Sequence, residues 1–162
     1  MRKWPTLEDV RQAEAALAGV TYRTPLQESS YVNDLIGSRV FFKLENLQRS
    51  GSFKLRGAYN RIRRLSADEL TRGVVAASAG NHAQGVALAA GLVGTTAVIV
   101  TPEGASLNKI EATRSYGAEV RQVGETFDDA FQEALHIAES TGRVLIHAFD
   151  DPLIVAGQGT IG

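Results

Sequence analysis

The chain has 162 residues, of which 44% are hydrophobic and 22% charged, and its 17 basic and 18 acidic side chains leave a formal net charge of -1. This composition fits a globular protein with one ordinary core and excludes the disordered and fibrous classes. The balanced charge gives no field that would recruit nucleic acid or an anionic membrane, and the lack of cysteine excludes disulfides and thiolate metal sites.

Short elements are expected before residue 50. Thr6, with Asp9 three residues later, is typical of a capping box, so a helix should follow and end at Gly19. A second helix is expected over residues 31–35 and a strand over residues 40–44. The polar N-terminus shows no apolar leader, and no apolar span of about 18 residues is present, so the expected location is the cytoplasm.

A regular alternation of strands and helices then begins. Short apolar runs start near Val74, Ala97, Val120 and Val144, and each is followed by a helical stretch. This βα repetition predicts an α/β fold with an open parallel sheet, right-handed crossovers and helices on both faces.

Several further features concern helix ends and one helix surface. Thr126 and Asp129 form a second capping pair. Residues 150–152 are interpreted as a turn before a helix, and a new helix is expected over residues 154–162, with the run GQGT at its start. The arginines near residue 62, namely Arg61, Arg63 and Arg64, are interpreted as a solvated helix face.

Lys54 is the most informative single residue. It lies in the run SGSFKLRGA at residues 50–58, between an aromatic side chain and a leucine. A lysine that snorkels from the start of an amphipathic helix would explain it without any chemistry. Alternatively, it is an amine held at a site, because desolvation beside Phe53 would lower its pKa, as an amine that forms an imine requires.

A polar turn, SAGNHAQG at residues 78–85, connects an apolar strand to an alanine-rich helix. One interpretation is structural, with Asn81 or Ser78 capping the helix. The other is ligand binding: a helix entered through Gly80 presents free amides and a positive dipole end at the carboxyl end of a parallel strand, which suits a carboxylate. The two interpretations are compatible.

Other motifs are absent. His136 and His147 have no ligand-like spacing to other histidines or carboxylates, so no metal site is expected. The sequence contains no P-loop, zinc-protease motif or nucleophile elbow.

Together, the runs at residues 50–58 and 78–85 resemble the fold-type-II pyridoxal-phosphate enzymes, and within them the serine/threonine dehydratases, or threonine ammonia-lyases. This resemblance implies three segments. They are the N-terminal part of a large catalytic domain (1–53), a small α/β domain (54–150) and the start of the return to the large domain (151–162). The chain is therefore interpreted as an N-terminal portion that is inactive alone.

The resemblance also implies site roles. The cofactor would be pyridoxal 5′-phosphate, with Lys54 as both the Schiff-base residue and the base at the substrate Cα. Phe53 would pack on the pyridine ring, and Asn81 would reach the cofactor's 3-hydroxyl oxygen. The substrate carboxylate would be held by Ser78, Asn81 and His82.

The implied activity is dehydration and deamination of L-threonine, and of L-serine, to 2-oxobutanoate or pyruvate and ammonia. The implied setting is amino-acid metabolism, including isoleucine biosynthesis, in a cytoplasmic homo-oligomer. One alternative is a non-catalytic folding or assembly fragment, and another is a serine-racemase-like enzyme. Ala79 argues against the latter, because racemase-like relatives carry a second serine there. The glycine-rich phosphate loop and the residue that bonds the pyridine nitrogen are expected beyond Gly162.

Overall fold

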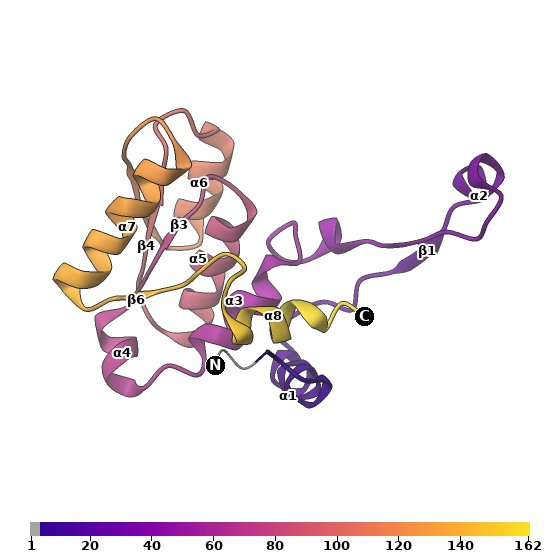
Figure 1. Ribbon diagram of the computed structural model, residues 1–162, viewed down its shortest axis with the longest axis horizontal. Coiled ribbons are helices and arrows are strands. Elements are labelled where there is room, and N and C mark those ends of the chain that lie inside the picture. Colours follow the sequence, from indigo (N-terminus) through magenta and orange to yellow (C-terminus); the bar gives the residue numbers. More distant parts are fainter. Residues whose placement is uncertain (1–3) are drawn as a thin grey trace.

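The computed structural model describes residues 4–162, so the first three residues of the polar N-terminus lie outside the described part (Figure 1). The helices are α1 (Leu7–Leu17), α2 (Ser30–Ile36), α3 (Lys54–Ile62), α4 (Ala67–Arg72), α5 (Asn81–Val93), α6 (Leu107–Ser115), α7 (Phe127–Thr141) and α8 (Pro152–Gly159), with a short 3-10 helix, η1 (Glu45–Leu47). The strands are β1 (Leu26–Glu28), β2 (Phe41–Lys43), β3 (Val74–Ala77), β4 (Ala97–Thr101), β5 (Glu119–Gln122) and β6 (Val144–Leu145).

The centre of the body is a four-stranded parallel sheet with the order β5-β4-β3-β6. Its side chains alternate between two apolar clusters. Val74 and Ile99 pack with α3 and α5 on one face, whereas Val75 and Val100 pack with α7 on the other. The prediction of a parallel sheet covered on both faces is therefore confirmed.

The strand order reverses beside β3. From β3 the chain builds outward through β4 to β5, then crosses back along α7 and adds β6 to the opposite side of β3. In an open α/β sheet such a switch point leaves a crevice at the carboxyl ends of the two strands, where ligands bind. Here those ends lead into Ser78 and into Ile146.

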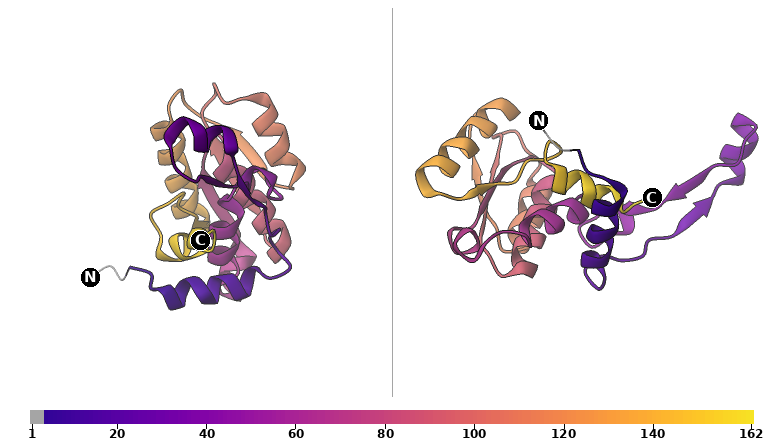
Figure 2. Two further views of the ribbon diagram at one scale, coloured as in Figure 1. Left: turned by 90° about the vertical axis from the view of Figure 1, so that its right-hand side faces the viewer. Right: turned by 60° about the horizontal axis from the view of Figure 1, so that its bottom comes forward.

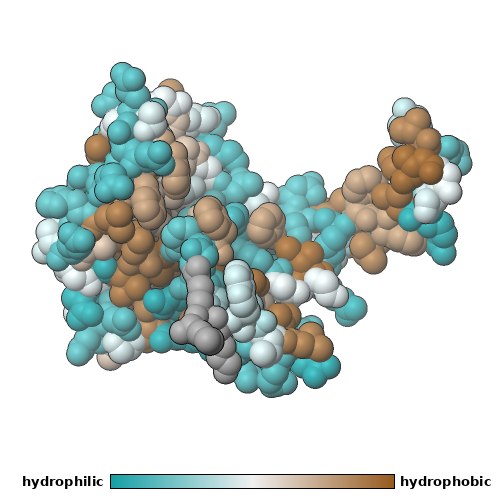
Figure 3. All heavy atoms as spheres, viewed as in Figure 1, coloured by the Kyte–Doolittle hydropathy of each residue, from teal (hydrophilic) through white to brown (hydrophobic). Residues whose placement is uncertain are grey.

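The N-terminal elements form a helix beside the body and an arm that projects from it (Figures 1 and 2). The expected capping box of Thr6 and Asp9 is present, although α1 ends at Leu17, two residues before Gly19. The arm consists of β1 and β2, which pair antiparallel, and α2 at its tip. Much of its apolar surface is exposed (Figure 3), from Leu26, Tyr31, Leu35, Ile36, Phe41 and Phe42.

The expectation for the last helix is wrong in its boundaries. Asp151 caps α8 by accepting from the Leu153 amide at 2.7 Å, and Pro152 occupies the first helical turn, where its missing N–H costs nothing. The run GQGT therefore lies at the end of α8 and not at its start. Gly157 is needed for close packing, because a Cβ there would lie 2.6 Å from Gly57 Cα on α3.

The interpretation of the arginine cluster as a solvated face is wrong for Arg61. Its Nε donates to Asp151 Oδ2 at 2.9 Å, and each side chain of the pair is only 20% exposed. Arg63 is half-buried, and only Arg64 is exposed. The contact between Arg61 and Asp151 ties α3 to the start of α8.

Candidate active site

Lys54 is the first residue of α3, and its side chain reaches the segment that follows β6. Its Nζ donates to the Ala148 carbonyl at 2.9 Å, and it lies 5.3 Å from the centroid of the Phe53 ring. The side chain is half-buried, and desolvation lowers its pKa below the ordinary lysine value. The expected direction of this shift is thus present.

A close helix crossing fixes the backbone at Lys54. Helix α5 packs against α3, and a Cβ added to Gly85 would lie 3.0 Å from the Lys54 carbonyl carbon and 3.1 Å from the Leu55 nitrogen. Such contacts are tighter than a side chain normally makes with backbone. The glycine therefore permits the start of α3 to lie directly on the first turns of α5.

The turn after β3 enters α5 without a side-chain cap. Gly80 is the N-cap residue and has no side chain, so the expectation that Asn81 or Ser78 caps the helix is wrong. The Ser78 hydroxyl oxygen instead accepts from the Gly80 amide at 3.2 Å. The amides at the start of α5 thus remain available to an anion, beside the positive end of the helix dipole.

His82 is buried, with 4% of its surface exposed, and its Nε2 lies 3.0 Å from the Ile146 carbonyl oxygen. Because a carbonyl only accepts, Nε2 carries the proton and donates. Within the described residues, Nδ1 is a buried atom without a hydrogen-bond partner. Desolvation lowers the pKa of His82 to about 4, so the imidazole is neutral at neutral pH.

Lys54 and His82 therefore meet the same short segment, residues 146–148, from two different helices. The segment also lines a pocket of about 190 Å³ at the carboxyl edge of the sheet, together with Ala77, Phe127, Asp128, Phe131 and Phe149. Asn81 is exposed at the same edge, where its Oδ1 accepts from Lys109 Nζ at 3.1 Å. The structure thus brings Lys54 and His82 to the carbonyls of Ala148 and Ile146 and Asn81 to Lys109, whereas none of the predicted site residues lines this pocket.

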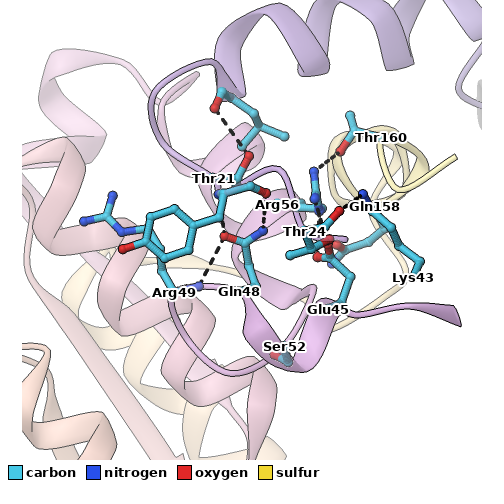
Figure 4. A network of polar contacts seen from close by, with 12 residues as sticks. Thr21, Thr24, Lys43, Glu45, Gln48, Arg49, Ser52, Arg56, Gln158 and Thr160 are labelled. Carbon is cyan, nitrogen blue, oxygen red and sulfur yellow. Dashed lines mark hydrogen bonds and ion pairs between the residues drawn. The ribbon is translucent and has the colours of Figure 1, made fainter. Parts of the chain in front are cut away.

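A buried ion pair between Arg56 and Glu45 connects α3 to η1, and Arg56 also contacts the end of α8 (Figure 4). Arg56 donates from Nε and Nη2 to the two carboxylate oxygens of Glu45, both at 2.8 Å. Thr24 donates to Glu45 Oε1 at 2.6 Å, and Arg56 Nη1 donates to Thr160 Oγ1 at 3.2 Å. Burial alone would raise the pKa of Glu45, but the hydrogen bonds from Arg56 and Thr24 outweigh it, so the pKa lies below its ordinary value.

The ring of His147 has structural contacts. His147 Nδ1 accepts from the amides of Phe149 and Asp150, and its ring packs edge-on against Phe149. Among residues 4–162, no group of three or more histidines, cysteines or carboxylates is arranged to hold a metal ion. Nor does that part of the chain contain a helix long and apolar enough to cross a membrane.

The buried neutral His82 leads to a testable pH dependence. Its pKa is about 4 in the folded chain and 6.5 in the unfolded one, so the unfolded chain binds the proton first on acidification. The free energy of unfolding should fall between about pH 6.5 and pH 4, by up to about 3 kcal/mol. Urea unfolding measured across this range, with His82→Gln as the control that loses this contribution, tests the assignment. An equal pH dependence in both proteins would contradict it.

The chain is similar to known proteins both in sequence and in structure. Residues 17–162 match the family model described as pyridoxal-phosphate dependent enzyme. The chain is 55% identical to the L-threonine ammonia-lyase of Thermotoga maritima over 157 residues, which are 97% of this chain and 39% of that relative.

Solved structures of two plant enzymes are also similar. Maize serine racemase superposes with a TM-score of 0.93 at 36% identity, over 98% of this chain and 48% of that one. The processed form of threonine deaminase isoform 2 from Solanum lycopersicum gives 0.89 at 40% identity, over 99% and 46%. The chain spans about half the length of these structures and less of the ammonia-lyase. Since the family model covers nearly the whole chain, the chain belongs to the pyridoxal-phosphate dependent enzymes.

Proposed function

We propose that the chain supplies the cofactor lysine and the substrate carboxylate site of a threonine ammonia-lyase, which deaminates L-threonine to 2-oxobutanoate and L-serine to pyruvate. The observation that carries this proposal is the convergence of Lys54 and the start of α5 on residues 146–148. The identity to a threonine ammonia-lyase supports the choice of reaction. Because one methyl group changes binding by only about 1 to 3 kcal/mol, activity on serine should accompany activity on threonine.

The residues present fit pyridoxal phosphate. Lys54 offers an amine whose lowered pKa favours the neutral form needed to react with an aldehyde. Phe53, whose ring lies beside that amine, would pack on the pyridine ring, and Asn81 would reach the 3-hydroxyl oxygen. When bound, the cofactor supplies a conjugated system that accepts the electron pair left at the substrate Cα.

The chain's own residues would then perform two tasks. The α5 amides, the Ser78 hydroxyl and the Asn81 side-chain amide would hold the substrate carboxylate and so fix the direction of the Cα–H bond. Once released from the cofactor, Lys54 would take the Cα proton. The His82 side chain would act mainly as a support, because its Nε2 proton is used by Ile146 and its Nδ1 can only accept.

A serine-racemase-like activity is the second candidate, favoured by the superposition on maize serine racemase. Racemisation needs a proton carrier on each face of the cofactor, whereas elimination uses only the face of the lysine. Ala79 is exposed in the turn before α5 and has no titratable group. We therefore favour elimination, and formation of D-serine from L-serine would decide for the racemase.

A third candidate is a non-catalytic assembly fragment, which would bind no cofactor at Lys54.

We also propose the setting in which the chain works. Residues 1–53 and 151–162 would belong to a large catalytic domain, and residues 54–150 would form the small one. The exposed apolar surface of the arm supports self-association, which sedimentation at increasing concentration would measure. A monomer at all concentrations would contradict it.

We further propose a cytoplasmic location, which cell fractionation would check. We also propose a role in isoleucine biosynthesis, which would be checked by whether loss of the gene makes cells require isoleucine.

The proposal can be tested on the chain itself. The chain should be incubated with pyridoxal phosphate and reduced with borohydride, and the labelled lysine should be identified by peptide mass spectrometry. We expect the label on Lys54 in preference to Lys43 and Lys109, and none at position 54 in Lys54→Arg. Parallel assays of 2-oxobutanoate from L-threonine should give little turnover, because the relatives are about twice as long. Labelling spread evenly over the lysines would contradict the proposed role of Lys54.

A further inference from the structure

Lys109 contacts the candidate carboxylate site from a neighbouring helix. It is the third residue of α6, and its ammonium donates to Asn81 Oδ1 at 3.1 Å. An ammonium has three donors and no acceptor, so Asn81 must turn its oxygen toward Lys109. The Nδ2 amino group of Asn81 then points elsewhere, and it donates to no residue within the described range 4–162.

The position of Lys109 is unfavourable for α6 itself. Cations near a helix N-terminus oppose the helix dipole, and acidic residues are preferred there. The first turn of α6 nevertheless contains no acidic residue, and its N-cap Ser106 makes no capping hydrogen bond. The ammonium also lies beside the start of α5, where the dipole is again positive. The N-termini of α5 and α6 and the ammonium of Lys109 therefore lie close together, and their positive charge favours the binding of an anion.

Because the His82 imidazole is neutral, Asn81 becomes a more important hydrogen-bond donor for the substrate carboxylate. Three side chains in this turn are candidates to hold a carboxylate, but the neutral imidazole donates from Nε2 to Ile146 and has no proton on its buried Nδ1, so it has no donor left for a carboxylate. The side-chain donors that remain are the Ser78 hydroxyl and Asn81 Nδ2. If the side-chain amide of Asn81 were rotated so that Oδ1 and Nδ2 exchanged places, an acceptor would face the carboxylate in place of the Nδ2 donor.

We infer that Lys109 is a positioning residue: it holds the Asn81 amide with its donor group toward the substrate carboxylate and adds a positive charge beside it. This inference rests on the proposed function. The reversed amide would place two donors against each other at the Lys109 contact, so the ammonium selects one orientation. An arginine at position 109 would keep both the charge and the donors, whereas a methionine would keep only the length of the side chain.

The test uses the isotope-labelled, cofactor-free chain and L-threonine as the probe. NMR titration would follow the backbone amides of Gly80, Asn81 and His82 and the Asn81 side-chain amide. We expect Lys109→Met to raise the dissociation constant roughly three- to tenfold, and Lys109→Arg to stay within about twofold of the original chain. Arg114→Met, which removes an exposed charge from the other end of α6, is the matched control and should also stay within about twofold.

The possible outcomes separate the inference from the function on which it rests. If L-threonine shifts these amides and binds Lys109→Met as tightly as the original chain, the inference is wrong and the carboxylate site stands. Equal weakening in Lys109→Met and Arg114→Met would also overturn it, because a general charge effect would then suffice. If L-threonine shifts none of these amides in the original chain, the proposed carboxylate site is itself wrong.

Discussion

Replacing Lys54 with alanine should reduce threonine deamination by at least about a thousandfold. The expected loss is large because, in the proposed function, one amine would have two tasks, holding the cofactor and removing the Cα proton. The measurement needs an active protein, for which a chimera that continues this chain with the second half of the Thermotoga maritima ammonia-lyase is suitable. Production of 2-oxobutanoate from L-threonine, at saturating cofactor, is the readout.

Lys54→Arg separates chemistry from structure in this experiment. A guanidinium keeps the positive charge and can still donate to the Ala148 carbonyl, but it stays protonated at all accessible pH values and cannot act as a nucleophile or base. We therefore expect the arginine variant to be as inactive as the alanine variant, with an unchanged urea midpoint. Activity near that of the original chimera in Lys54→Arg would mean that Lys54 only supports the fold.

The parallel sheet could be predicted because its signals are local. Each strand is an apolar run and each following helix has its own start and stop residues, so Val74, Ala97, Val120 and Val144 fall at or within one residue of the observed strand starts. The start of α8 was predicted less well from the local sequence. The GQGT run has the composition of a helix entry, but Asp151 and Pro152 provide the stronger start five residues earlier.

The site could be predicted only in part. The sequence points to Lys54 and the turn at 78–85 as candidates, because their residue types are unusual for their surroundings. It does not identify the carbonyls of Ile146 and Ala148, since every residue has one and the contacts span 64 and 94 positions. Likewise, Lys109 has no local signal for its contact with Asn81, which depends on how α6 packs beside α5.

Glu45→Ala should destabilise the chain by about 3 to 5 kcal/mol. The substitution leaves the Arg56 guanidinium, whose side chain is only 7% exposed, without its carboxylate partner. Thr24 loses its acceptor as well. Urea unfolding measures the change, and Glu119→Ala provides the matched control. That carboxylate also accepts from an arginine, Arg121 at 2.7 Å, but its side chain is 54% exposed, so its loss should cost no more than about 1 kcal/mol.

A double substitution would show why the buried pair is present. Replacing Glu45 with leucine and Arg56 with methionine removes both charges together, so no unpaired ion is left, and the stability should recover most of what Glu45→Ala loses. The pair would then be dispensable for stability but would still fix geometry, because Arg56 lies two residues after Lys54 and anchors α3 to η1 and to Thr160. In the chimera, we expect this variant to be folded yet slower at threonine deamination, with the loss in kcat. A stable variant with full activity would mean that packing alone positions Lys54.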